Sequence, residues 1–192
     1  KEKKRDAYPL LEAAIKELEN VPQYQKKQEE YKLTYGKIIS NMGSYYYQRK
    51  EYEEALKWHK KALEFRKISL PDRVMDSYRT IMSDYFCMKQ YEKGYETYRE
   101  AVKKTQPDAL FLVRAIGCEL CLLKEKKEEN LEKQILEELP VQIERVVELA
   151  VSNRRMNVGV LKDLQKKLEE LEAWTELQEL VKEYRTKIEE YL

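Results

Sequence analysis

The sequence has 192 residues, of which 42% are hydrophobic and 38% are charged. Its 37 basic and 36 acidic residues leave a net charge of +1, without the basic excess that a dedicated nucleic-acid binder carries. No apolar run reaches the ~20 residues of a membrane span, no secretory signal opens the sequence, and three irregularly spaced cysteines form no disulfide framework. We therefore expect a cytoplasmic protein with no membrane partner, and the scarcity of Gly and Pro favours helices over sheets.

The first predicted helix covers residues 6–20 and ends before Val21-Pro22. The clearest repeated unit follows at Ile38–Phe65, where apolar or small residues recur at helical three-and-four spacing on both sides of a short polar joint, Arg49–Glu51. Two amphipathic helices with a short joint form an antiparallel hairpin. The positions that form its predicted interior are Ile39, Met42, Gly43, Tyr46, Tyr52, Ala55, Leu56, His59, Ala62 and Leu63.

Small residues indicate how the two helices of this hairpin approach each other. Gly43 in mid-helix costs about 1 kcal/mol relative to Ala, so we interpret it as a notch that admits the partner helix. Ala55 and Ala62 play the same part from the other side.

A second unit repeats this pattern 39 positions later, with Met82 in place of Gly43 and Gly94 in place of Ala55. The surplus over a 34-residue repeat is assigned to a longer connection over Arg66–Asp72. Pro71 is expected to open the next helix, because its missing N–H costs little there.

A third, weaker unit begins at Pro107-Asp108, with Gly117 in the small position and a partner helix within Asn130–Leu139. Pro140 is expected to kink or restart a helix. Residues 161–191 keep a helical period, which fits either one long coiled-coil helix or two helices joined near Ala173-Trp174. We favour the two-helix interpretation, since Thr175 and Gln178 have capping-box spacing.

These units resemble the tetratricopeptide (TPR) motif, closely over 38–105 and more weakly to 139, although Ile39 and His59 replace residues that are usually aromatic. The resemblance implies an all-α fold, a right-handed α-solenoid of TPR-like hairpins with about nine or ten helices. We expect a single domain over 1–192, with capping helices at 1–36, repeats at 37–139 and C-terminal helices at 140–192.

No catalytic, metal or cofactor site is evident. His59 is interpreted as a packed hairpin residue, and Cys118 and Cys121 lie three apart on one helix face without the second ligand pair that a zinc site needs. Cys87 is interpreted in the same way, and no glycine-rich phosphate loop is present. The sequence therefore favours a binding protein over an enzyme.

Candidate binding residues lie on the sides of the first helices that are not used for packing. Amides there can both donate to and accept from a peptide backbone, and arginines in register can clamp a carboxylate. An ordinary solvated helix face is the alternative interpretation. The predicted peptide-binding residues are Lys37, Asn41, Ser44, Tyr47, Gln48, Arg79, Ser83, Phe86 and Arg114.

The long period and the Lys/Tyr-rich segment 37–65 also resemble the C-terminal repeat domain of peptide-sensing regulators of Gram-positive bacteria, the Rap, NprR, PlcR and Rgg group. The resemblance implies a quorum-sensing transcription regulator that binds a short signalling peptide in its concave groove, as a homodimer, with Asn41 holding the peptide backbone. DNA would be bound only through a domain absent from this chain. A constitutive adaptor for protein assembly is the alternative. The candidates for a dimer interface, or alternatively for residues that cover the core, are Trp174, Tyr184, Ile188 and Tyr191.

Overall fold

The computed structural model describes residues 7–125, 128–152 and 158–192, and within these ranges it contains helices and connections but no strand. The predicted all-α fold of TPR-like hairpins is confirmed, with ten α-helices in the described part of the chain. The chain forms two compact units, residues 1–90 and 91–192, and each is described by itself. Asp6, where the first helix was expected to begin, lies outside the described residues.

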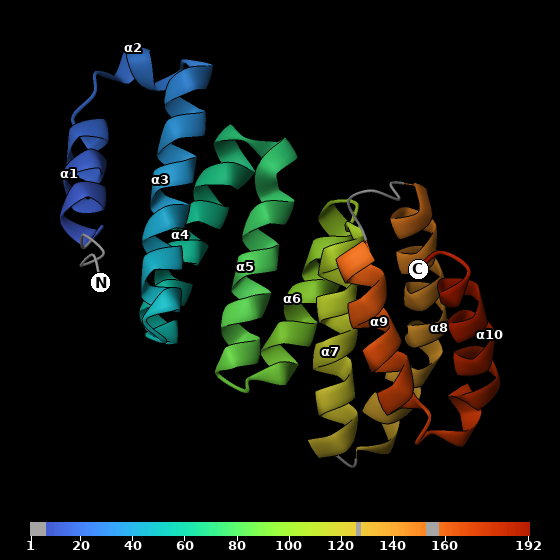
Figure 1. Ribbon diagram of the computed structural model, residues 1–192. Coiled ribbons are helices and arrows are strands. Elements are labelled where there is room, and N and C mark those ends of the chain that lie inside the picture. Colours follow the sequence, from blue (N-terminus) through green and yellow to red (C-terminus); the bar gives the residue numbers. More distant parts are fainter. Residues whose placement is uncertain (1–6, 126–127, 153–157) are drawn as a thin grey trace, which may run out of the picture. The chain divides into compact units, whose positions relative to one another are not determined.

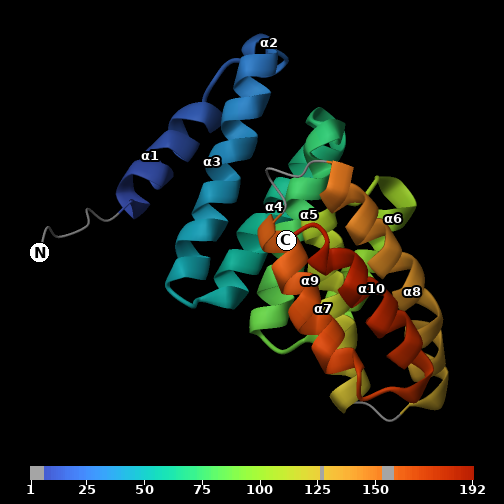
Figure 2. The ribbon, with the colours of Figure 1, turned by 45° about the vertical axis from the view of Figure 1, so that its right-hand side comes forward.

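From residue 7 onward, the first unit holds five α-helices and a short 3₁₀ turn (Figure 1). Helix α3 packs against α1 and α4, and α4 in turn packs against α5, so α3 and α4 form the predicted hairpin. Figure 2 shows α1 lying along α3, where Ile15, Tyr35, Ile39 and Met42 are buried together. The elements are α1 (Tyr8–Glu19), α2 (Gln23–Lys26), α3 (Glu29–Gln48), α4 (Tyr52–Ser69), η1 (Pro71–Arg73) and α5 (Val74–Cys87).

Helices α3 and α5 end in the same turn. Lys50 and Lys89, 39 positions apart, both have left-handed backbone, with φ of 65° and 57°. After α3, the amide of Glu51 donates to the carbonyl of Tyr46, and after α5, the amide of Gln90 donates to that of Tyr85. These are Schellman bonds, which satisfy the last carbonyls of a helix. The predicted joint at residues 49–51 and the 39-residue period are therefore confirmed.

The second unit is helical throughout its described residues. Helix α7 packs against α6, α8 and α9, and α10 packs against α8 and α9. Asp108 starts α7, since its carboxylate accepts a hydrogen bond from the amide of Phe111 at 2.8 Å. The elements are α6 (Tyr91–Lys104), α7 (Ala109–Glu125), α8 (Glu129–Ser152), α9 (Val158–Leu171), η2 (Thr175–Leu177) and α10 (Gln178–Glu189).

For the C-terminal helices, the predicted joint is confirmed and the predicted capping box is wrong. A joint at 172–174 separates α9 from α10, as the two-helix interpretation predicted. However, Thr175 caps no helix, and the side-chain Nε2 of Gln178 instead donates to the backbone carbonyl of Glu172. Pro140 does not restart a helix, because α8 continues through it, and the kink expected there stays a prediction. Tyr184 and Ile188 are buried within the unit. Their burial favours the interpretation that these two residues cover the core over the alternative that they form a dimer interface.

The long connection predicted at Arg66–Asp72 is also wrong in part. Helix α4 continues to Ser69, so most of the surplus over a 34-residue repeat is an extra helical turn. Arg66 lies in this extra turn, and its buried guanidinium donates two hydrogen bonds. Pro71 does open the following 3₁₀ turn, as expected. Helix α3 crosses the boundary expected at 36/37, and the single-domain prediction stays a prediction.

Candidate functional site

One side of α3 carries a line of polar side chains that do not enter the core. Lys37, Asn41, Ser44 and Gln48 follow one another at four-, three- and four-residue steps, so they share one face of the helix. Lys37, Asn41 and Gln48 are exposed and Ser44 is half-buried. The hydroxyl of Ser44 donates to the carbonyl of Ser40 in its own helix, so the Ser44 side chain lies against the helix and projects little from it.

The corresponding side of α5 carries Asp76, Arg79, Ser83 and Phe86. Asp76 and Arg79 form an ion pair at 3.6 Å, and the hydroxyl of Ser83 donates to the carbonyl of Arg79. Phe86 is 40% exposed, which is unusual for a large aromatic side chain. This face therefore combines a charged end, a small position and an aromatic end.

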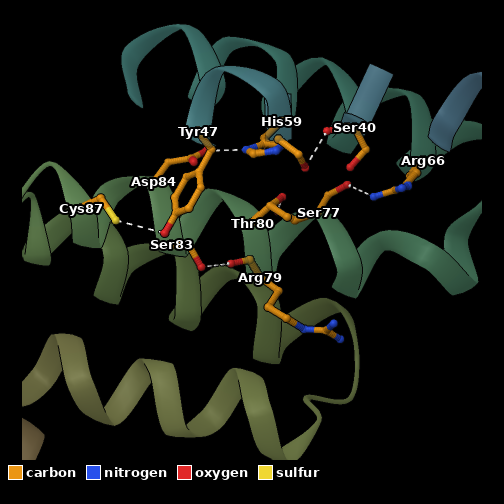
Figure 3. A network of polar contacts seen from close by, with 11 residues as sticks. Ser40, Tyr47, His59, Arg66, Ser77, Arg79, Thr80, Ser83, Asp84 and Cys87 are labelled. Atoms are coloured by element: carbon orange, nitrogen blue, oxygen red, sulfur yellow. Dashed lines mark hydrogen bonds and ion pairs between the residues drawn. The ribbon is translucent and has the colours of Figure 1, made fainter. Parts of the chain in front are cut away.

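The two polar sides lie next to each other, because α3 and α5 meet at both ends. Near their starts, Lys37 and Asp76 line the same pocket of about 360 Å³. Near their ends, the hydroxyl of Tyr47 lies 3.1 Å from the Sγ of Cys87 (Figure 3). These pairs are 39 and 40 positions apart, which matches the repeat period. We call the surface formed by Lys37, Asn41, Ser44, Gln48, Arg79, Ser83 and Phe86 the α3–α5 face.

Eight of the nine predicted site residues belong to α3 or α5, but their side chains differ in exposure and in contacts. Tyr47 is half-buried, and its hydroxyl contacts Cys87 rather than pointing freely outward. Arg114 is half-buried on α7, in the second unit. The clamp predicted from Arg79 and Arg114 stays a prediction.

Beneath this face, a buried polar pair joins the first repeat to the second. The Nδ1 of His59, on α4, lies 2.6 Å from an Asp84 carboxylate oxygen on α5, and the two side chains are only 2% and 0% exposed (Figure 3). Burial raises the pKa of Asp84, while its bond to His59 opposes that shift. His59 is thus a packed hairpin residue, as predicted.

The same ring gives a physical reason for the glycine at position 43. A Cβ placed on Gly43 would lie 2.4 Å from the His59 Cδ2, so only glycine fits opposite the imidazole. The partner Asp84 was missed by sequence reasoning. A buried acid in α5 leaves no periodic signal, and its pairing depends on how α4 and α5 pack.

The second unit has a buried polar pair of its own. The Gln142 Nε2, on α8, donates to Glu119, on α7, at 2.7 Å, and Glu119 is fully buried. Burial raises the pKa of Glu119 to about 8. The visible signal was a single acid inside the apolar run Ile116–Leu120, and sequence reasoning did not use it.

The thiols of α7 are placed as packing residues. Cys118 is buried and Cys121 half-buried, and burial raises the pKa of Cys118 to about 12. A reactive thiol needs its pKa lowered rather than raised. Among the described residues, no group of three His, Cys, Asp or Glu side chains could hold a metal ion.

Helical hairpins repeated at a fixed period, with polar side chains along their first helices, are typical of a repeat protein. Residues 37–73 match the family model of the tetratricopeptide repeat, from within α3 through α4 to the end of η1. The match supports classification as a TPR protein and a role in protein–protein interaction. No curated protein matches the chain. No helix in the described part is long and apolar enough to cross a membrane.

Proposed function

We propose that this chain binds a polypeptide segment along the α3–α5 face. The observation that carries the proposal is the exposed row of Lys37, Asn41 and Gln48 beside α5, with an exposed Phe86 at its end. Asparagine and glutamine amides match the alternating donors and acceptors of an extended backbone, and Phe86 offers an apolar contact for a side chain.

Contacts between the two repeats support the same function. Two contacts join the first repeat to the second. The partly buried one is between Tyr47 and Cys87, and the fully buried one is between His59 and Asp84. A face held in one geometry before binding loses less conformational entropy when a peptide is bound.

The experiment is a selection of short peptides from a displayed random library, followed by calorimetric titration of one selected peptide. Asn41→Ala and Phe86→Ala are each expected to weaken binding about tenfold, the effect of losing one well-placed contact. Lys57→Ala, at an exposed position of α4, is the control and should leave the affinity unchanged. Equal affinity for all three variants would contradict the proposal.

In its finer form, the proposal is that the chain is the peptide-sensing domain of a transcription regulator and acts as a homodimer. The resemblance of segment 37–65 to such regulators is its support. A selected peptide should then change the association state in analytical ultracentrifugation. A constitutive adaptor would instead hold one large partner in fixed stoichiometry, with no effect of a short peptide.

A further inference from the structure

A buried cation lies at the wall of an open pocket near the start of the α3–α5 face. Arg66, on α4, is 8% exposed, and its guanidinium donates to the Ser77 hydroxyl at 2.8 Å and to the Gly36 carbonyl at 3.3 Å. Figure 3 shows the Arg66 and Ser77 side chains meeting. Both acceptors are neutral, so the two bonds fix the guanidinium without cancelling its charge.

No carboxylate forms an ion pair with Arg66 anywhere in the described residues. Buried charges are ordinarily paired, because removing a charge from water costs several kcal/mol. A guanidinium has five N–H donors, and the two bonds here leave others for a further acceptor. Burial also lowers the pKa of Arg66 from its ordinary value, as expected for a cation that has lost hydration.

The pocket that Arg66 lines has a volume of about 360 Å³ and carries two more cationic side chains, Lys37 and Arg73. Both are exposed, and neither forms an ion pair within the described part of the chain. The three come from α3, α4 and η1, so the fold brings them together around one space. Leu33, Gly36 and Leu70 complete the wall.

Carboxylates near the pocket offset only part of its positive charge, since Asp76 is the one acid beside three cations among the described residues that line it, and its attraction favours the charged form of Arg66. Asp76 is the acidic residue of this pocket, and its carboxylate is paired with Arg79. An adjoining pocket of about 540 Å³ shares Leu33, Leu70 and Arg73 and adds Glu29 and Asp72. These two acids are exposed, where solvent and salt screen their charge, whereas Arg66 is shielded from solvent.

We propose that the pocket formed by Lys37, Arg66 and Arg73 is a binding site for a small oxyanion group, a carboxylate or a phosphate. The guanidinium of Arg66 offers N–H groups at the base, and Lys37 and Arg73 supply charge at the opening. Planar guanidinium groups match the paired oxygens of either anion. The site stands independently of peptide binding along the rest of the α3–α5 face.

The test is an NMR titration of the ¹⁵N-labelled chain with inorganic phosphate and, separately, with acetate, at constant ionic strength. Saturable shifts are expected for the amides of residues 33–37 and 70–76. The double variant Lys37→Gln/Arg73→Gln should weaken binding about tenfold or more. A matched control, Arg49→Gln/Lys57→Gln, removes the same charge from exposed positions and should bind like the parent.

Arg66→Lys keeps the positive charge but removes the paired N–H groups of the guanidinium, so it tests whether those groups bind the anion. Circular dichroism checks that this variant folds. If Arg66→Lys unfolds the chain, the Lys37→Gln/Arg73→Gln variant still tests the proposal, because both of its substitutions are at exposed positions. Saturation by phosphate alone would identify a phosphate group, and saturation by acetate a carboxylate. No saturable shift with either anion, or equal weakening in both double variants, would overturn the proposal.

Discussion

The two units bury a polar pair in the same kind of place, between neighbouring helices, but with different partners. In the first unit Asp84 meets an imidazole, which can carry positive charge. In the second, Glu119 meets an amide, which cannot. Burial raises the pKa of both acids, and in the first unit the His59 ring acts against it. In the second unit the hydrogen bond from Gln142 opposes the effect of burial, yet the pKa of Glu119 is still raised to about 8.

The two tryptophans allow the units to be followed separately, since Trp58 lies in the first and Trp174 in the second. A Trp174→Phe background reports on the first unit, and a Trp58→Phe background on the second. Urea unfolding monitored by fluorescence then gives a free energy of unfolding for each.

The largest expected effect is that of pH on the second unit. The pKa of Glu119 is about 8 in the folded chain against 4.5 in the unfolded one. Between these values the folded state binds more protons, so stability is full below pH 4.5 and falls as pH rises toward 8. The loss is on the order of 4 kcal/mol. Unfolding followed by Trp174 at several pH values measures it.

Glu119→Gln should remove this part of the pH dependence, since an amide can still accept from Gln142 and does not titrate. The difference between variant and parent should therefore grow from about pH 5 to pH 8. Parallel pH profiles for the two proteins would show that Glu119 is not the titrating group.

The second-largest expected effect on stability comes from breaking the contact between His59 and Asp84 in the first unit. Asp84→Ala leaves the His59 Nδ1 buried without its hydrogen-bond partner, and the first unit should lose about 3 kcal/mol. Asp84→Asn should lose less, because its amide oxygen can still accept a hydrogen bond. Trp58 fluorescence is the readout, and equal losses for Ala and Asn would mean that the bond is not what stabilises this contact.

Gly43→Ala tests the close contact with His59. The new methyl would overlap the ring, so a loss of about 2 kcal/mol is expected in the first unit. Gly159→Ala is the matched control, because a Cβ there meets nothing within 4 Å. It should stabilise the second unit by about 0.5 kcal/mol through helix propensity. A neutral Gly43→Ala would refute the notch interpretation.

The smallest effect concerns the turns. Lys50→Gly should stabilise the first unit by up to about 1 kcal/mol, since glycine adopts the left-handed backbone at lower cost. Thermal unfolding monitored by Trp58 detects this gain, and a destabilised variant would argue against the Schellman turn.

The sequence was most informative where packing is local. Gly43, Ala55 and the three-residue joint fixed the hairpin and its 39-residue register, because small residues and short turns constrain neighbouring helices directly. The faces of α3 and α5 followed from helical period alone. Those two helices carry eight of the nine predicted site residues.

What could not be predicted depends on contacts between distant residues. Asp84 and Ser77 lie on α5, and only the packing of α4 against α5 pairs them with His59 and Arg66. Helix α4 also continues to Ser69, beyond the predicted end. Thr175 had the spacing of a cap, but the 3₁₀ turn η2 displaced it.

The central claim is that a polypeptide segment lies along the α3–α5 face, and site-specific photo-crosslinking tests it most directly. A benzophenone side chain replaces Asn41 in one protein and Lys57 in another, and each is irradiated with the selected peptide. Mass spectrometry should find the peptide attached at position 41 and not at position 57. Attachment at position 57 alone, or equally at both, would contradict the claim.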